Sequence, residues 1–331
     1  MRDLSTLPKA HLHLHLELGM RPATLAELAA KYGEPVPIVR GYGSFTAFSA
    51  MCGAAIDFMR ERADWQRLAD EICADAAHDG ATYIEPGFWA GQHRPHWGSD
   101  EATWRMVMEE FDAAGARHGV AVRFLAAVDR VFDDEAASIE LAELAVKLRG
   151  DDDRIGVVAL GLHNDEVGHP PGDFVRAFQI ARDGGLLSTP HAGELDAGHV
   201  VAEAIDLLGA NRIQHGVRSF EVPGLVERLA AEGVCLDVCP TSNVLLSVFP
   251  SLAEHPLPRF LAAGVRCSLN ADDPLLFGPG ILDEYELCRG ELALSDEQLA
   301  SMARSSFECS GAPAAVKRAG VAGIDAWLAA G

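Results

Sequence analysis

The 331-residue chain lacks features that define several classes of protein. No segment approaches the ~18 consecutive apolar residues that a membrane-spanning helix needs. The N-terminus has no uninterrupted apolar core of the kind that a secretory signal carries, so we expect a cytoplasmic protein. Basic residues are scarce, because 27 Lys and Arg stand against 49 Asp and Glu, giving a formal net charge of −22. This charge repels nucleic acids and anionic membranes, so we expect neither as a partner.

Paired cysteines and linkers are also absent. The seven cysteines include no C-x-x-C pair, and an odd number in a large chain is typical of reduced thiols in the cytoplasm. No low-complexity run, long linker or internal repeat divides the sequence. With 49% apolar and 23% charged residues the composition is globular, and we expect residues 1–331 to form a single domain.

What the chain does contain is a regular succession of apolar runs and helical patterns. Eight short, often β-branched runs are each followed by a polar turn and a helix-like segment, which predicts βα units and a parallel sheet. The runs begin near Ala10, Ala81, Ala121, Gly156, Gly185, Arg212, Gly233 and Gly264. An open, doubly wound sheet would need a glycine-rich phosphate turn after its first strand, and none follows Glu17. The pattern therefore favours an α/β fold of the (β/α)8 TIM-barrel type.

Two regions exceed one βα unit. Residues 22–80 have helical periodicity and predict a helical insertion after the first strand, which would lie over the mouth of the barrel as a lid or wall. Its aromatic residues, among them Phe45 and Phe48, are interpreted as the insertion's own core rather than as a wall that stacks on a substrate. Extra helices at the C-terminus, including residues 295–311, would complete or cover the barrel.

The first apolar run has the sharpest pattern, because His11, His13 and His15 alternate with leucines. On a strand these side chains share one face at about 6.6–7 Å spacing. Two imidazoles so placed can bind one ion at Zn–N distances of about 2.0–2.1 Å. His13 and His15 lie nearer the C-terminal end of the strand, where barrel active sites form, and Glu17 would lie at the rim. An ordinary alternating strand is the competing interpretation, but three inward histidines would fill a barrel core at high cost.

Further candidates end later strands. His191, His215 and Asp272 would converge on the same end of a barrel, and a His/carboxylate set without thiolate suits zinc or a similar divalent ion. A lone histidine is usually structural, but this convergence has no simple packing purpose. Glu194 is placed to donate a proton, and Asp273 could face a substrate while Asp272 binds the metal. His215 is either a ligand or the base that activates water.

Taken together, these motifs resemble the adenosine deaminase family of the amidohydrolase superfamily. The resemblance runs through PKAHLHLHLELGMRP at 8–22, NDE at 164–166, PHAGE at 190–194, RIQHG at 212–216, CPTSN at 239–243 and NADDPLLFG at 270–278. It implies a single barrel that binds one Zn²⁺ ion and hydrolyses the amino group of an aminopurine. It further implies these roles: His13, His15, His191 and Asp272 as metal ligands, Glu194 as the acid for purine N1, His215 as the residue that activates water, Asp273 as the partner of N7, and Asn164 at a position where relatives place a glycine whose amide meets N3.

The chain departs from the family pattern where the sugar of a nucleoside would lie. Adenosine deaminases usually read H-x-H-L-D-G, whereas this chain has Glu17-Leu18 in place of Asp-Gly. We expect the substrate to be a small-molecule 6-aminopurine nucleoside such as adenosine, which would give an inosine-type product and ammonia. Adenine and a modified adenosine such as aminodeoxyfutalosine are alternatives. Oligomeric assembly is compatible with the sequence.

Other functions lack part of their signature. A two-metal amidohydrolase that opens cyclic amides would carry a bridging lysine after the fourth strand, and residues 156–166 contain none. A cytidine deaminase would need P-C-x-x-C. A non-catalytic, deaminase-like binding protein would have no chemical need for the full set of acids and histidines. His93 is interpreted as part of a solvated loop, and a loop that contacts the substrate is the alternative, since loops after barrel strands face the active site. His163 is left unassigned, and Ser242 is predicted to orient a metal ligand.

Overall fold

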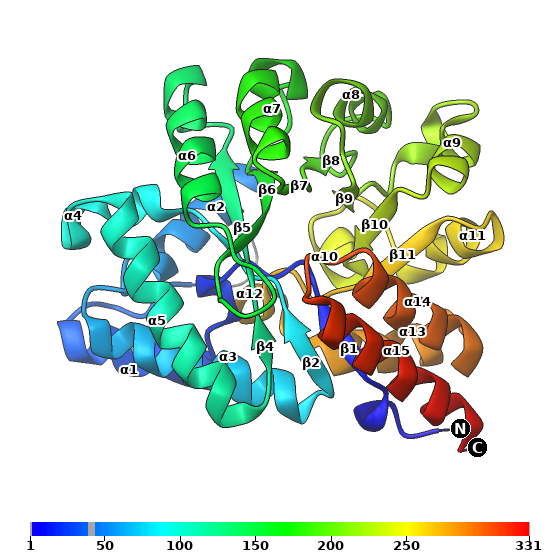
Figure 1. Ribbon diagram of the computed structural model, residues 1–331, viewed down its shortest axis with the longest axis horizontal. Helices are drawn as coiled ribbons and strands as arrows, with labels where there is room; N and C mark the ends of the chain where they lie inside the picture. The colour runs from blue at the N-terminus through cyan, green and yellow to red at the C-terminus, as the bar shows by residue number, and fades with distance from the viewer. Residues whose placement is uncertain (1, 39–43, 331) are drawn as a thin grey trace.

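The computed structural model describes residues 2–38 and 44–330, in which short parallel strands alternate with helices (Figure 1). The strands are β1 (Lys9–His11), β2 (Ala81–Ile84), β3 (Gly87–Phe88), β4 (Ala121–Val122), β5 (Phe124–Asp129), β6 (Val157–His163), β7 (Leu187–Ser188), β8 (His191–Ala192), β9 (Arg212–His215), β10 (Cys235–Val238) and β11 (Arg266–Leu269). They occupy the eight predicted runs, because β2 with β3, β4 with β5, and β7 with β8 are interrupted halves of one segment.

The helices lie around the outside of these strands, as Figure 1 shows. The α-helices are α1 (Pro22–Tyr32), α2 (Phe45–Ile56), α3 (Arg62–His78), α4 (Arg94–Trp97), α5 (Asp100–His118), α6 (Glu135–Lys147), α7 (Val175–Asp183), α8 (His199–Leu208), α9 (Leu225–Glu232), α10 (Pro240–Leu245), α11 (Leu257–Ala262), α12 (Pro274–Phe277), α13 (Ile281–Gly290), α14 (Asp296–Glu308) and α15 (Ala314–Ala329). Two of the short 3₁₀ helices, η2 (Glu17–Gly19) and η3 (Ala90–His93), bear on the site. No described helix is long and apolar enough to cross a membrane.

Parallel pairing runs through three ladders, β1-β2-β4, β3-β5-β6-β7 and β8-β9-β10-β11. The segments after the first and last strands are joined by a parallel bridge between Leu14 and Asp272, and a bridge between His15 and Gly87 joins the first ladder to the second. β5 is buried throughout and β6 almost so, as expected of strands covered on both faces. The architecture is the predicted (β/α)8 barrel, with α1, α2 and α3 inserted after the first strand.

The first strand is shorter than predicted. β1 ends at His11, and the backbone N–H groups of Leu12 and His13 donate to the side-chain Oδ1 of Asn270 at 2.7 and 3.1 Å. A side chain thus replaces the neighbouring strand as the hydrogen-bond acceptor. This interrupts the ladder while keeping the chain extended, so His13 and His15 still reach the C-terminal end of the barrel.

The predicted C-terminal helices cover the barrel and bring the two ends of the chain together (Figure 1). α14 begins with a capping box, in which the Ser295 hydroxyl accepts from the N–H of Gln298 and the Gln298 side chain accepts from the N–H of Ser295. Arg2 donates to the carbonyl of Leu328 at 2.7 Å, near the end of α15. The seven cysteines are free thiols, as predicted.

Candidate active site

Four predicted metal ligands from three barrel segments meet at one point. Asp272 Oδ1 lies 3.1 Å from His13 Nε2 and 3.2 Å from His15 Nε2, and His13 Nε2 lies 3.1 Å from His191 Nε2. The four ligand atoms all fall within 4.8 Å of one another. Imidazole nitrogens and a carboxylate oxygen at such separations surround a space that suits a cation.

The geometry of this cluster fits a tetrahedral divalent ion. Ligand atoms bound at about 2.0–2.1 Å to a tetrahedral zinc lie roughly 3.3–3.4 Å apart, close to the separations observed. Three nitrogens and one oxygen are donors that zinc accepts. Asp272 also adopts a left-handed backbone with φ of 62°, a strained conformation that turns its carboxylate toward the histidines. Burial and the like charge of neighbouring imidazoles lower the pKa of His191 well below its usual range, so its ring is neutral and free to ligate.

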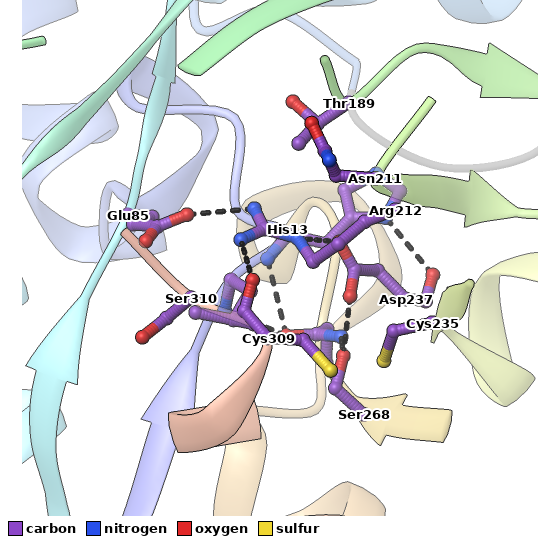
Figure 2. A network of polar contacts seen from close by, with 12 residues as sticks. His13, Glu85, Thr189, Asn211, Arg212, Cys235, Asp237, Ser268, Cys309 and Ser310 are labelled. Carbon is purple, nitrogen blue, oxygen red and sulfur yellow. Dashed lines mark hydrogen bonds and ion pairs between the residues drawn. The ribbon is translucent and has the colours of Figure 1, made fainter. Parts of the chain in front are cut away.

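A buried ionic network lies beside His13 and contacts it through the backbone carbonyl of Asp237 (Figure 2). Arg212 donates to Glu85 Oε2 at 2.6 Å and to Asp237 Oδ2 at 2.9 Å, and all three side chains are fully buried. Ser268 donates to the second oxygen of Asp237 at 2.7 Å. The carbonyl oxygen of Asp237 lies 3.3 Å from His13 Nδ1, which leaves Nε2 to face the cluster.

Ser242 contacts a second ligand, as predicted. Its hydroxyl donates to Asp272 Oδ2 at 2.6 Å, so Oδ1 remains directed at His13 and His15. His11, in contrast, does not join the cluster, because its Nε2 accepts the N–H of Ala271 at 3.1 Å.

Glu194 and His215 face each other beside the cluster. His215 Nε2 lies 3.3 Å from Glu194 Oε2 and 3.9 Å from Asp272 Oδ2. Asn243 lies against both, with Nδ2 3.1 Å from Glu194 Oε1 and 3.2 Å from His215 Nδ1. His255 in turn contacts Asn243 Oδ1 at 3.2 Å. Asn243 and His255 were missed by sequence reasoning, although Asn243 belongs to the quoted CPTSN segment.

Burial determines the charge state of the acids in this site. It raises the pKa of Glu194 well above its usual range, and the negative charge of Asp272 adds to the rise. The pKa of Asp273 is raised for the same two reasons. A neutral carboxylic acid donates a hydrogen bond, which an ionised one cannot do, so both groups can serve as donors to ring nitrogens.

A cavity of about 610 Å³ opens over the cluster, and all three predicted substrate-binding residues, Glu17, Asn164 and Asp273, line it. Asn164 has a left-handed φ of 76°, a conformation that asparagine and glycine tolerate better than other residues. Its side-chain amide donates to both oxygens of Asp129 at 3.1 and 2.9 Å. None of the described residues that line the cavity is a lysine or an arginine.

One prediction about the outer wall of the cavity was wrong. His93 is not in a solvated loop: only 1% of it is exposed, its Nε2 lies 2.7 Å from Glu17 Oε1, and Trp65 and Phe88 pack against its ring. Phe48 belongs to the buried core and Phe45 packs against that core, as predicted, but both also line the cavity. Helix periodicity identifies an apolar face without indicating everything that the face contacts. The unassigned His163 also lines the cavity.

Comparisons with known proteins agree with this geometry. The family model described as adenosine deaminase matches residues 8–327. A putative adenosine/adenine deaminase of Streptomyces virginiae is 40% identical over 338 residues, covering 99% of this chain and 98% of that protein. An adenine deaminase of Mesorhizobium japonicum is 36% identical, with 91% and 93% covered. The crystal structure of an adenine deaminase from Arthrobacter aurescens superposes with a TM-score of 0.89 at 29% identity, covering 97% of this chain and 99% of that one. The chain therefore belongs to the adenosine deaminase family of hydrolytic deaminases that act on C–N bonds.

Proposed function

We propose that this protein is a zinc-dependent deaminase of free adenine, which it hydrolyses to hypoxanthine and ammonia. The observation that supports it best is that the candidate metal cluster and two buried acids, Glu194 and Asp273, whose pKa values are raised by burial, lie on the wall of one cavity. A hydrolytic deaminase needs an activated water and a donor for the ring nitrogen beside the carbon that is attacked.

In this proposal His13, His15, His191 and Asp272 hold one Zn²⁺ ion, which would lower the pKa of a bound water toward neutrality. His215 accepts the proton of the attacking water. Glu194 donates its proton to N1, so that the negative charge that develops when C6 is attacked does not remain on the ring. Asp273 donates a hydrogen bond to N7 and fixes the orientation of the base. Water adds at C6, the amino group takes the proton held by His215 and leaves as ammonia, and the hydroxyl proton of the intermediate returns to Glu194 as the C6 carbonyl forms.

The polar groups of the outer wall favour a base without a sugar. Glu17 is held by His93, the Nε2 of Gln92 donates to the carbonyl of Gly53 at 3.0 Å, and Asp129 accepts from Asn164. Each of these groups already has a hydrogen-bond partner in the protein, so it offers little to ribose hydroxyls. Leu18 lines the cavity where relatives commonly have a glycine. Two of the relatives described above are named adenine deaminases.

A nucleotide is disfavoured because the cavity offers no partner for its phosphate. None of the described residues that line the cavity is a lysine or an arginine. A phosphate group would therefore find none of the cationic side chains that phosphate sites use.

Adenosine is the second candidate, and the size of the cavity favours it. About 610 Å³ exceeds the space that a purine ring alone requires and falls within the range of sites for larger ligands. Thr46 and Ser49 of α2 line the cavity and carry hydroxyl groups that a sugar could contact.

A panel of substrates separates these candidates. The zinc-loaded protein would be incubated with adenine, adenosine, AMP and aminodeoxyfutalosine, and ammonia and the 6-oxopurine product would be quantified. We expect the highest kcat/KM for adenine and no turnover of AMP. A higher kcat/KM for adenosine would transfer the assignment to the nucleoside, and no ammonia from any member would contradict the proposed function.

A further inference from the structure

The loop of residues 191–196 carries both a metal ligand and the proposed proton donor, so its position decides two functions at once. His191 opens β8, and Glu194 follows three residues later. Gly193, between them, has a left-handed φ of 68°, and a Cβ at that position would lie 2.4 Å from Val201 Cγ2. The tight turn at this glycine gives the loop no regular secondary structure with which to satisfy its own backbone.

One buried carboxylate accepts three of the loop's backbone N–H groups. Glu166 Oε2 lies 3.1 Å from the nitrogens of both Gly193 and Asp196, and Oε1 lies 3.3 Å from the nitrogen of Glu194. Only 2% of Glu166 is exposed. Charge-assisted hydrogen bonds of this kind are stronger than neutral ones. Without the carboxylate, two buried donors and the half-buried donor of Asp196 would lose their acceptor.

A buried guanidinium holds the other end of the same loop. Arg130 Nη2 donates to the carbonyl of His191 at 2.7 Å and to that of Leu162 at 3.2 Å. Arg130 is also 2% exposed, and its charge is attracted to that of Glu166. Carbonyl groups are thus bound by the cation and N–H groups by the anion, so each charge matches the backbone groups that it faces.

We propose that Arg130 and Glu166 form a clamp in which Arg130 positions the metal ligand His191 and Glu166 positions the proton donor Glu194. Glu166 closes the 164–166 motif, of which the sequence interpretation used only Asn164. Neither clamp residue contacts the purine in this account; both are positioning residues that act through the loop. The inference rests on the proposed function, because that proposal assigns the role of Glu194.

The clamp predicts that substitution of Glu166 lowers kcat, whereas substitution of Arg130 lowers zinc affinity. In Glu166→Gln the side chain keeps its size, but one carboxylate oxygen is replaced by an NH₂ group. This group is a hydrogen-bond donor and cannot accept the backbone N–H groups that it faces. We expect kcat for adenine to fall about 10–100-fold, with KM and zinc content unchanged, because the metal ligands keep their support. In Arg130→Lys the charge remains, but the planar guanidinium is lost whose Nη2 donates to the carbonyls of Leu162 and His191 and whose Nη1 donates to that of His169. We therefore expect zinc affinity to fall about 10–100-fold.

The matched control is Glu221→Gln. A carboxylate oxygen of Glu221 also accepts a backbone N–H group, that of Gly198 at 3.0 Å. Gly198 follows the 191–196 loop in the sequence, so this contact does not support the loop itself. We expect kcat and zinc affinity to stay within twofold of the wild type. Glu166→Asp, whose shorter side chain reaches fewer of the three donors, should give a kcat between those of the wild type and Glu166→Gln, and it replaces the glutamine variant if that one does not fold.

Amide hydrogen exchange of the zinc-loaded proteins tests the clamp without using activity. We expect Gly193, Glu194 and Asp196 to exchange at least tenfold faster in Glu166→Gln than in the wild type, with β9 and β10 unchanged. Unchanged exchange at these amides would overturn the clamp, as would a joint loss of zinc, thermal stability and kcat in Glu166→Gln. If the wild type deaminates no 6-aminopurine, the proposed function fails, while the exchange rates and the zinc affinity of Arg130→Lys still decide whether the clamp exists.

Discussion

The inner and outer halves of the cavity differ in how their polar groups are used. At the inner end, His13, His15, His191 and Asp272 point their ligand atoms at one shared space. At the outer wall, Glu17, Gln92 and Asp129 are bound to other protein groups. The inner groups direct ligand atoms at a shared space, which suits the binding of an ion. The outer groups are hydrogen-bonded to other protein groups, so they fix the shape of the space around the substrate. The inner half should therefore determine the chemistry and the outer half the choice of substrate.

The largest effect is expected from the inner end. His13→Ala removes a ligand together with its link to Asp237. We expect zinc content to fall well below one ion per chain and kcat/KM for adenine to fall by roughly 10³-fold or more, because several kcal/mol of metal-derived stabilisation is lost. Elemental analysis beside steady-state kinetics measures both. Full zinc content with normal turnover would remove His13 from the metal site.

A smaller effect is expected one contact further out. Ser242→Ala leaves every ligand in place but frees Asp272 Oδ2 from its 2.6 Å hydrogen bond. Zinc affinity should fall about 10–100-fold, as substitutions of groups that orient metal ligands commonly do. Competition with a chelator of known affinity provides the measurement. The matched control is Ser251→Ala, which changes a half-buried serine outside the cavity and should leave the zinc affinity unaltered.

The smallest effect on the reaction, and the clearest on specificity, is expected from the outer wall. His93→Phe fills the space between Trp65 and Phe88 but releases Glu17. We expect the ratio of kcat/KM for adenine to that for adenosine to change by about tenfold, because a small change in one pocket contact contributes about 1–3 kcal/mol to discrimination between substrates. Zinc content should stay at the wild-type value. A loss of zinc in this variant would break the division between the two halves.

The same division describes what could be predicted from the sequence. The convergence of the four candidate ligands with Glu194, His215 and Asp273 was predictable, because metal and acid chemistry limits such positions to a few residue types and parallel strands bring their C-terminal ends together. The roles of these residues stay predictions. Ser242 was predictable from its place in a quoted motif. His93 was assigned to a solvated loop, and Asn243 and Glu166 were not assigned. Each of the three contacts a residue distant in sequence, and no local pattern reports such contacts. Single-domain organisation and a cytoplasmic location stay predictions.

Local periodicity also failed in instructive places. The His/Leu alternation predicts a long first strand, but Asn270 accepts the N–H groups of Leu12 and His13 and the ladder stops at His11. The helical pattern of residues 22–80 predicts α1, α2 and α3 correctly, but it does not reveal that Phe45 and Phe48 face the cavity. In both cases a tertiary contact decides between structures that the local pattern allows equally.

The central claim is that the inner cluster and Glu194 together deaminate a 6-aminopurine by hydrolysis. Its most direct test compares the zinc-loaded wild type with Glu194→Gln at equal zinc content, with adenine as substrate. We predict one ammonia and one hypoxanthine per adenine from the wild type, and a kcat lower by about 10²–10⁴-fold in the variant, the usual contribution of a general acid. Equal turnover by the two proteins, or no ammonia from the wild type, would contradict the account.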